Sequence, residues 1–382
     1  MRKTVTIGDL GIVITGKTPP TTNKNYYGDY AVFIKPTDIS EQSKFTYETE
    51  EMYSRLAAEK YESSLVPKGA ICVPCIGTIG TKMTMTHCDC YTNQSINSIV
   101  CNENFDNEYV YYLIKNFLPG LKAYNLGTAS GREYVSKSNF EKIELEVELD
   151  KDIQKRIGMF LSRYDSLIEN YQKQIKLLEE AAQRLYKEWF VDLHFPGHEN
   201  TKIVDGVPEG WELSKLGSLA EFKRGKTITK KDIVDGSIPV VAGGLEPAYY
   251  CNKFNTAERV ITVSGSGANA GFTRMYFEKV WASDCSYVDW ATTPFLHFVY
   301  CYLKDNKTTI DNMQKGAAQP HVYAKDINAL GLCIPTEDVL NIFEIKVSRY
   351  FNTISSLQSQ IRLLTEARDR LLPKLMSGEI AV

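Results

Sequence analysis

The chain lacks long hydrophobic runs and carries little net charge. No apolar stretch among its 382 residues approaches the ~18 residues needed to cross a bilayer, and residues 1–9 show no apolar signal core. The formal net charge of −3 argues against a protein that coats nucleic acid non-specifically, but it leaves room for local basic patches that contact DNA phosphates. We therefore expect a cytoplasmic protein with no membrane partner.

Histidine is scarce, and motifs for catalysis are missing. None of the five histidines sits in a motif with a nucleophile or a paired carboxylate. The Asn/Asp-Pro-Pro-aromatic motif of amino-group methyltransferases is absent, and there is no convincing nuclease cluster of carboxylates with lysine. The chain is predicted to be a binding protein and not an enzyme.

The nine cysteines indicate neither disulfides nor zinc. Their number is odd in a chain without a recognisable signal core, so reduced thiols are expected. Cys72 and Cys75 have the spacing of a zinc-binding pair, but Cys88 and Cys90 are too close together for the usual second pair. The second half of the chain has no equivalent set, so buried free thiols are the simpler interpretation and no metal site is predicted.

What the chain does have is an internal repeat. The tripeptide 162–164 (SRY) recurs at 348–350, and the run 174–181 (QIKLLEEA) recurs as QIRLLTEA, in both cases 186 residues later. A block of about half the chain is therefore duplicated, which decides the architecture before any single motif. Weaker matches link Gly16-Lys17-Thr18 with Gly225-Lys226-Thr227, the apolar run 70–76 with 260–263, and Tyr134 with Tyr323.

Each copy ends in a long helical pattern, at 150–190 and at 336–376. Apolar residues there recur in alternating steps of three and four, which is typical of the seam of a coiled coil. Two amphipathic helices packed on separate cores remain the alternative. Pro373 is expected to end or kink the second helix. The predicted seam residues are Ile168, Tyr171, Ile175, Leu178, Leu185, Ile354, Leu357, Ile361, Leu364 and Leu371.

Composition divides the chain into five segments. Residues 1–149 and 212–335 mix short strand patterns with turn signals, whereas 150–193 and 336–382 hold the helices. Residues 194–211 are rich in Pro, Gly and polar residues and are expected to form a linker. The predicted fold class is α+β, with two pseudo-twofold-related mixed α/β domains separated by two long helices that form an antiparallel intramolecular coiled coil.

Two glycine-rich segments imitate nucleotide-binding motifs. Residues 11–18 match the phosphate-binding loop pattern G-x-x-x-x-G-K-[ST], but Pro19 and Pro20 follow at once, where that loop requires a helix to begin. The turn is therefore expected to end a strand and to offer Lys17 and hydroxyl groups to an anion. Residues 264–271 resemble a dinucleotide fingerprint with the wrong glycine spacing, so they are predicted to form a hairpin tip.

Loops at matching positions of the repeat carry cationic, amide and hydroxyl side chains. These groups can bond DNA phosphates and base edges, although each residue taken singly is equally well explained as part of a solvated loop. The predicted DNA contacts of the first copy are Lys17, Thr18, Thr21, Lys24, Asn25, Tyr26, Lys35, Asn93, Gln94, Arg132, Tyr134 and Lys137. Those of the second copy are Lys223, Arg224, Lys226, Lys230, Lys231, Asn269, Arg274, Lys315, Gln319, His321 and Tyr323.

The whole arrangement resembles the specificity subunit of type I restriction–modification enzymes. The residues that carry this resemblance are 10–21, 27–39, 127–134, the Pro-Glu-Gly-Trp phrase at 208–211 and the Leu-Met-Ser-Gly-Glu phrase at 375–379. The resemblance implies two target-recognition domains, each of which reads half of a split, asymmetric site in double-stranded DNA, while the coil sets the gap between the halves.

The resemblance also implies the partners. Two modification subunits would bind S-adenosylmethionine and methylate adenine, and restriction subunits would use ATP and Mg²⁺ for translocation and cleavage, so this chain itself would bind no cofactor. Two other functions remain open at this point. One is the recognition portion of a self-contained restriction–methylation enzyme, and the other is a coiled-coil scaffold that joins two proteins without binding DNA.

Overall fold

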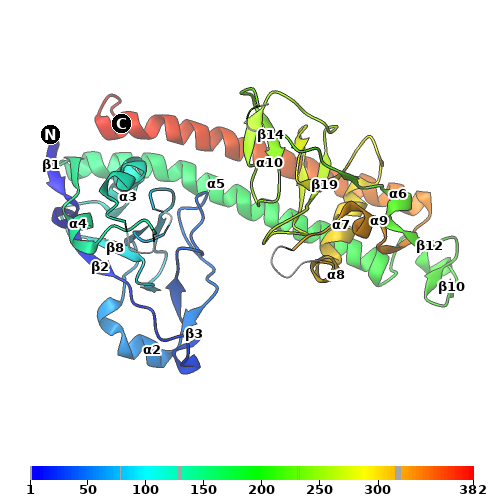
Figure 1. The fold of residues 1–382 in the computed structure, drawn as a ribbon, viewed down its shortest axis with the longest axis horizontal. Coiled ribbons are helices and arrows are strands. Elements are labelled where there is room, and N and C mark those ends of the chain that lie inside the picture. Colours follow the sequence, from blue (N-terminus) through cyan, green and yellow to red (C-terminus); the bar gives the residue numbers. More distant parts are fainter. Residues whose placement is uncertain (1, 78, 128–130, 230, 232, 315–319) are drawn as a thin grey trace. The chain divides into compact units, whose positions relative to one another are not determined.

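The computed structural model describes residues 2–382 except 78, 128–130, 230, 232 and 315–319 (Figure 1). Its contacts divide the chain into two units. The first unit comprises residues 1–171 and 360–382, and the second comprises residues 172–359. Each unit is mixed α/β and contains part of both long helices, so the predicted α+β class is confirmed.

The first unit is built on a four-stranded antiparallel sheet in the order β2 (Gly11–Thr15), β8 (Ile96–Cys101), β5 (Ile71–Pro74) and β6 (Thr84–Met85). Every residue of β5 is buried, as expected for a short, continuously apolar central strand. A smaller sheet joins β4 (Met52–Tyr53), β3 (Tyr27–Ile34) and β7 (Tyr91–Thr92), and β3 runs parallel to β7. Strand β1 (Arg2–Thr6) pairs with β9 (Glu144–Glu148).

Helices of the first unit cover these sheets and complete its core. The main one is α3 (Asn107–Phe117), which begins where the Asp106 side chain accepts a hydrogen bond from the Tyr109 amide. Its six consecutive buried residues, Tyr109–Ile114, pack with the apolar face of the large sheet. The shorter elements are α1 (Ile7–Leu10), η1 (Lys24–Tyr26), α2 (Arg55–Lys60), η2 (Glu62–Ser64), η3 (Leu118–Tyr124) and α4 (Lys137–Glu141).

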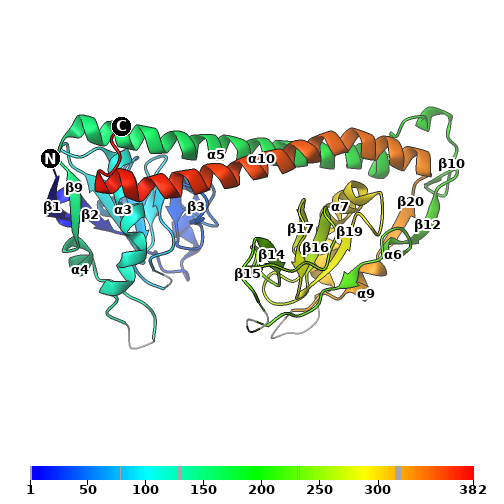
Figure 2. The same ribbon diagram turned by 90° about the horizontal axis from the view of Figure 1, so that it is seen from above.

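The second unit repeats this topology element by element (Figure 2). Its large sheet has the order β13 (Lys223–Arg224), β19 (Cys285–Asp289), β16 (Val260–Ser264) and β17 (Thr273–Tyr276). Its smaller sheet joins β15 (Tyr249–Cys251), β14 (Ile238–Val241) and β18 (Trp281–Ala282), again with one parallel pair, and β12 (Glu212–Lys215) pairs with β20 (Gly331–Ile334). Its helices are α6 (Leu216–Leu219), α7 (Leu296–Asp305), α8 (Lys307–Asn312) and α9 (Ala324–Asn328). The duplication seen in the helices therefore extends to both sheets.

One residue match made from the sequence is wrong. Tyr134 forms an isolated β-bridge with Ile76, and the equivalent bridge in the second unit joins His321 to Ser266. His321, and not Tyr323, is therefore the counterpart of Tyr134, while Tyr323 immediately precedes α9. The mismatch arose because an aromatic side chain was matched to an aromatic one, whereas the backbone pairing places an imidazole at this position.

The two long helices are α5 (Lys151–Tyr186), which continues as a π-helical turn at Lys187–Val191, and α10 (Glu337–Ser377). Both agree closely with the predicted spans. Pro373 does not end α10, which continues for four more residues. A proline removes only one amide hydrogen bond this near the end of a helix, and Leu375 and Met376 of the final turn are buried in the core of the first unit.

Within each unit, the local parts of α5 and α10 pack on each other. In the first unit Asp165 of α5 meets Arg368 of α10, and in the second unit Trp189 packs on Phe343 with ring centroids 5.8 Å apart. Residue numbers rise along one helix as they fall along the other, so the packed segments are antiparallel. None of the ten predicted seam residues is exposed.

The segment 194–211, expected to be a linker, contains ordered structure. It holds a short 3₁₀ turn η5 (His198–Asn200) and a two-stranded hairpin of β10 (Ile203–Val204) and β11 (Val207–Pro208). Phe195 and Trp211 flank the hairpin, pack together at 4.8 Å between ring centroids and are buried in the core of the second unit.

Candidate nucleic-acid interface

The Gly-Lys-Thr turns of the two units occupy the same place in the fold. The Gly16 amide donates to the carbonyl of Ile96 (3.1 Å) and the Lys17 amide to that of Thr92 (2.9 Å). In the second unit the Gly225 amide donates to Cys285 (2.8 Å) and the Lys226 amide to Ala282 (2.9 Å). Both turns are thus attached to the loop that joins the third strand of the small sheet to the large sheet.

Glycine is required at these turns because the backbones approach closely. A Cβ atom on Gly16 would lie 2.1 Å from the carbonyl oxygen of Thr92, and one on Gly225 would lie 2.3 Å from that of Ser283. No helix begins at Lys17 or Lys226, and β2 ends at Thr15. The prediction that the Gly-Lys-Thr motif ends a strand and is not a phosphate-binding loop is confirmed.

The lysine of each turn is fixed at its carbonyl and exposed at its side chain. The Tyr53 hydroxyl donates to the Lys17 carbonyl (2.5 Å), and the indole Nε1 of Trp281 donates to the Lys226 carbonyl (2.7 Å). Both lysines are exposed. The two units therefore present a cation at the same point, although different aromatic residues hold the two turns.

Two further segments meet each turn. In the first unit the Cys75 amide donates to the Ser95 carbonyl (2.7 Å) and the Val135 amide to the Cys75 carbonyl (2.8 Å). In the second unit the Gly265 amide donates to the Asp284 carbonyl and the Val322 amide to the Gly265 carbonyl, both at 3.1 Å. We call residues 16–18, 75–77, 93–95 and 133–135 the first loop cluster, and residues 225–227, 265–267, 283–285 and 320–322 the second loop cluster.

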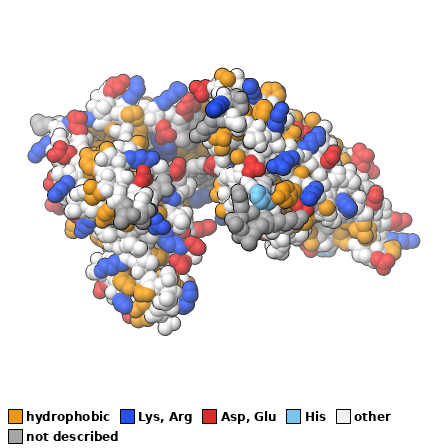
Figure 3. All heavy atoms as spheres, viewed as in Figure 1, with side chains coloured by type: hydrophobic (Ala, Val, Ile, Leu, Met, Phe, Trp, Pro, Cys, Tyr) orange, Lys and Arg blue, Asp and Glu red, His pale blue; other side chains and the backbone are white. Residues whose placement is uncertain are grey.

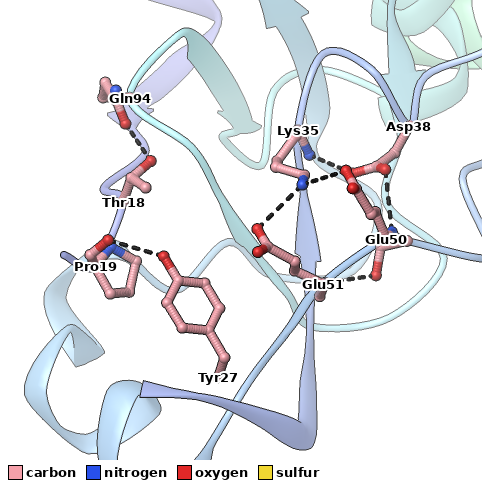
Figure 4. Close-up of polar contacts among 9 residues, drawn as sticks. Thr18, Pro19, Tyr27, Lys35, Asp38, Glu50, Glu51 and Gln94 are labelled. Atoms are coloured by element: carbon pink, nitrogen blue, oxygen red, sulfur yellow. Dashed lines mark hydrogen bonds and ion pairs between the residues drawn. The ribbon is translucent and has the colours of Figure 1, made fainter. Parts of the chain in front are cut away.

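The side chains at the tips of these clusters differ. In the first loop cluster the Thr18 hydroxyl donates to the side-chain oxygen of Gln94, which is exposed (Figure 4). In the second, the Ser266 hydroxyl donates to the carboxylate of Asp284, which is half-buried. The same backbone arrangement therefore displays an amide in one unit and a carboxylate in the other.

The second loop cluster is hollowed into a pocket of about 330 Å³. Arg224, Ser266, Asp284, His321 and Tyr323 contribute to its wall. The rings of His321 and Tyr323 are nearly parallel, with an interplanar angle of 11° and centroids 5.9 Å apart. The pocket thus combines an acceptor, a cation and a flat aromatic wall.

Several predicted contact residues lie outside the loop clusters. Lys24, Asn25 and Tyr26 form the 3₁₀ turn η1 after the first turn, Thr21 is exposed just before it, and Lys223 and Arg224 form β13. Lys231 and Arg132 are exposed, and Asn269 lies at the β16–β17 hairpin tip, where the Phe272 amide donates to its carbonyl (2.9 Å). Pairing of β16 with β17 up to Val263 and Thr273 confirms the predicted hairpin. Lys230, Lys315 and Gln319 lie outside the described residues.

Three predicted cations are already paired with carboxylates. Lys35 forms ion pairs with Glu50 (2.6 Å) and Glu51 (3.1 Å) at the edge of the small sheet (Figure 4). Arg274 pairs with Glu246 (3.0 Å), and Lys137 with Glu141 (3.6 Å). These side chains would have to leave their partners to bind phosphate, whereas Lys17 and Lys226 form no ion pair among the described residues.

Sequence reasoning missed Asp284 and Ser266. The search favoured cationic and amide side chains, so a carboxylate in a candidate DNA-binding loop was passed over. The available signal was the position of Asp284 in the run 282–285, which the repeat places against residues 92–96.

The cysteines contribute no metal site among the described residues, where no group of three or more His, Cys, Asp and Glu side chains could hold an ion. Burial raises the pKa of the Cys72 thiol and of the Cys75 thiol to about 12 each. Those two thiols are therefore protonated at neutral pH. No helix in the described part of the chain is long and apolar enough to cross a membrane.

Charge on the molecular surface is mixed. On the face shown in Figure 3, Lys and Arg side chains are interspersed with Asp and Glu and do not gather into one basic field. Such a surface agrees with the net charge of −3 and favours local contacts over non-specific coating of nucleic acid.

Comparison with known proteins gives consistent similarities. The family model "Type I restriction modification DNA specificity domain" matches residues 2–180 and 208–362. The type I restriction enzyme MjaIX specificity subunit of Methanocaldococcus jannaschii is 27% identical, with 98% of this chain and 93% of the relative covered. The HindI specificity subunit of Haemophilus influenzae is 34% identical over 43% of this chain and 36% of its own length. The crystal structure of an S subunit from M. genitalium shares the fold, with a TM-score of 0.58 and 16% identity over 98% of this chain and 96% of that one.

Proposed function

Because this chain belongs to the type I restriction modification DNA specificity family, we propose that it reads a bipartite DNA target, with one loop cluster on each half-site. Family membership confirms the predicted resemblance and the prediction of a specificity subunit in place of a catalytic one. The observation that supports bipartite reading is the duplicated loop cluster, which has the same backbone bonds but different tip residues in the two units. Unlike tips favour unlike half-sites, so the proposed target is asymmetric.

In this proposal the loop clusters divide the work between phosphates and bases. Lys17 and Lys226 are exposed at equivalent points and suit the phosphate backbone, which fixes orientation without reading sequence. Gln94 and Asp284 stand at the tips, where hydrogen bonds to base edges provide discrimination. The parallel between two phosphate-binding lysines and two different base-reading tips is what a split, asymmetric target requires.

The proposal includes the partners that such a subunit serves. Two modification subunits would supply S-adenosylmethionine and adenine methylation, and restriction subunits would supply ATP- and Mg²⁺-dependent cleavage. This chain has no predicted catalytic motif of its own, so its contribution would be placement of those subunits on the target.

Genome-wide mapping of adenine methylation tests the proposed function. Cells that carry this chain with its modification subunit are compared with cells that lack only this chain. We expect a split, asymmetric motif that disappears when the chain is removed. Unchanged methylation in the presence of an active modification subunit would contradict the proposal and favour a scaffold that does not bind DNA.

Replacing Lys17 or Lys226 with alanine is expected to weaken DNA binding by a similar factor on target and non-target duplexes. Each lysine removes about one phosphate contact, so the slope of log K against log salt should become shallower by ~0.9 per substitution. Binding titrations between 50 and 200 mM salt measure this slope. Lys253→Ala, which removes an exposed lysine outside the second loop cluster, should leave it unchanged.

A further inference from the structure

The pocket of the second loop cluster contains an acidic group in cationic surroundings. Asp284 lies on its wall together with Arg224, and Lys223 and Lys226 are exposed on the adjoining strand and turn. A carboxylate beside DNA is repelled by phosphates unless it accepts hydrogen bonds from the nucleic acid. The place of Asp284 in this pocket therefore restricts what the pocket can bind.

The chemistry of the carboxylate identifies the base edge. An ionised carboxylate only accepts hydrogen bonds, and in the major groove the donors on base edges are the N4 amine of cytosine and the N6 amine of adenine. The Ser266 hydroxyl already donates to one carboxylate oxygen and so holds the side chain in place. The carboxylate has further acceptor positions, which leaves capacity for an amine.

The first loop cluster provides the contrast. The Asn93 amide donates to the Ile34 carbonyl (3.0 Å) and the Ser283 amide to the Val241 carbonyl (2.8 Å), so the two loops leave their small sheets at equivalent residues. At the tip, however, the first loop has the neutral side chain of Gln94, which both donates and accepts and can bond adenine in bidentate fashion. The two tips therefore have different requirements.

We propose that the pocket formed by Arg224, Ser266, Asp284 and His321 binds the major-groove edge of a cytosine or adenine whose exocyclic amine donates to Asp284. Asp284 is thus a specificity-determining residue of the second half-site, and Gln94 has the corresponding role in the first. This inference rests on the proposed function, because it requires that the loop clusters face the two halves of a DNA target.

The test uses the complex of this chain with its modification subunits and a duplex that contains the mapped methylation target. Each adenine of the target is replaced in turn by purine, which lacks N6, and each cytosine by 2-pyrimidinone, which lacks N4. We expect one replacement in the second half-site to weaken binding ~5- to 150-fold. With Asp284→Asn, the same replacement should have a much smaller effect, because the carboxylate that it deprives of a donor is gone. The wild-type half of this test does not depend on how well the variant folds.

Methylation mapping with the variants gives a second readout. Asp284→Asn should relax the motif at one base pair of the second half-site only, and Gln94→Ala at one base pair of the first. Glu278→Gln removes the same charge from an exposed position after β17, at the other end of the large sheet, and should leave the motif intact.

The outcomes separate the two levels of the argument. If the wild-type chain directs no split motif, the proposed function fails. If it directs one, but no amine of the second half-site is coupled to Asp284 and the motif of Asp284→Asn is unchanged, the proposed function stands and the inference about the pocket is wrong.

Discussion

Replacing Asp165 with alanine is expected to destabilise the first unit by about 3–5 kcal/mol. The Asp165 carboxylate accepts hydrogen bonds from the Arg368 guanidinium and from the Tyr112 hydroxyl, and the Asp165 and Arg368 side chains are each only 7% exposed. Removal of the carboxylate would leave a buried guanidinium whose remaining printed partner, Asp369, is half exposed at 51%. A charge without its buried partner costs far more than the pair contributes.

The surroundings of this pair strengthen the expectation. Burial, together with the charge of Asp165, raises the pKa of Tyr112, so its hydroxyl stays protonated and donates throughout the physiological pH range. Burial also lowers the pKa of the nearby Lys115. A second buried cation so close by makes the loss of a carboxylate more costly.

Thermal and chemical unfolding of the purified chain measure the effect of Asp165→Ala. A loss of 3–5 kcal/mol corresponds to a fall in the melting temperature of the first unit of roughly 6–20 °C. The double variant Asp165→Leu with Arg368→Leu should be near the wild-type stability or above it, because Arg368 stands between Leu364 and Leu371 in the heptad pattern and a leucine continues that seam.

Glu366→Ala provides the matched control for this prediction. It breaks an exposed pair on the same helix, in which the Arg370 side chain is 78% exposed, and should change the stability by no more than about 0.5 kcal/mol. Equal stability of Asp165→Ala and Glu366→Ala would show that the buried pair does not matter as argued.

The buried pair also shows how the two copies of the repeat have diverged. At the repeat offset of 186 residues, Arg368 corresponds to Ala182 and Asp165 to Phe351, which are both buried in the apolar core of the second unit. One copy thus packs its helices around an ion pair and the other around aromatic and aliphatic side chains. A polar pair at one seam position specifies which residues face each other, and it does so only in the first unit.

The helices and the repeat could be predicted because their signals are periodic and local. Steps of three and four apolar residues gave α5 and α10 to within a few residues, and the duplicated tripeptide at 162–164 gave the offset. The effect of Pro373 was predicted wrongly because its position in the last turn, where Leu375 and Met376 are buried, is decided by packing and not by the sequence near the proline.

The candidate interface was less accessible from the sequence because it depends on pairing between distant segments. Lys35 looked like a free cation until Glu50 and Glu51 were found beside it. His321 became the partner of Ser266, and Asp284 joined the tip of a loop, only through hydrogen bonds between segments about 20 to 55 residues apart. Residue type selects candidates, but the register of the strands selects the group that reaches the surface.

Replacing Gly225 with alanine is expected to abolish reading of the second half-site. The new Cβ atom would overlap the Ser283 carbonyl oxygen at 2.3 Å, so the turn must move and lose the amide bonds from Gly225 to Cys285 and from Lys226 to Ala282. Lys226 and the tip at Asp284 would then no longer be held together. We expect at least a 100-fold loss of affinity for the full target, comparable with the upper cost of about 3 kcal/mol for one mismatched base pair.

Gly16→Ala is expected to have the mirror effect on the first half-site, because its Cβ atom would lie 2.1 Å from the Thr92 carbonyl oxygen. The measurement uses three duplexes, one with both half-sites and two with either half scrambled. For Gly225→Ala, scrambling the second half-site should cost nothing further, while scrambling the first should still weaken binding; Gly16→Ala should show the reverse.

The control for this pair is Gly331→Ala in β20 of the second unit, where a Cβ atom meets nothing within 4 Å. It should bind all three duplexes like the wild type. If Gly16→Ala and Gly225→Ala remained folded and each lost discrimination at both half-sites equally, the two loop clusters would not read separate halves. Loss confined to the matching half would show that each cluster acts as an independent reader, because the only lesion is a single methyl group against one backbone carbonyl.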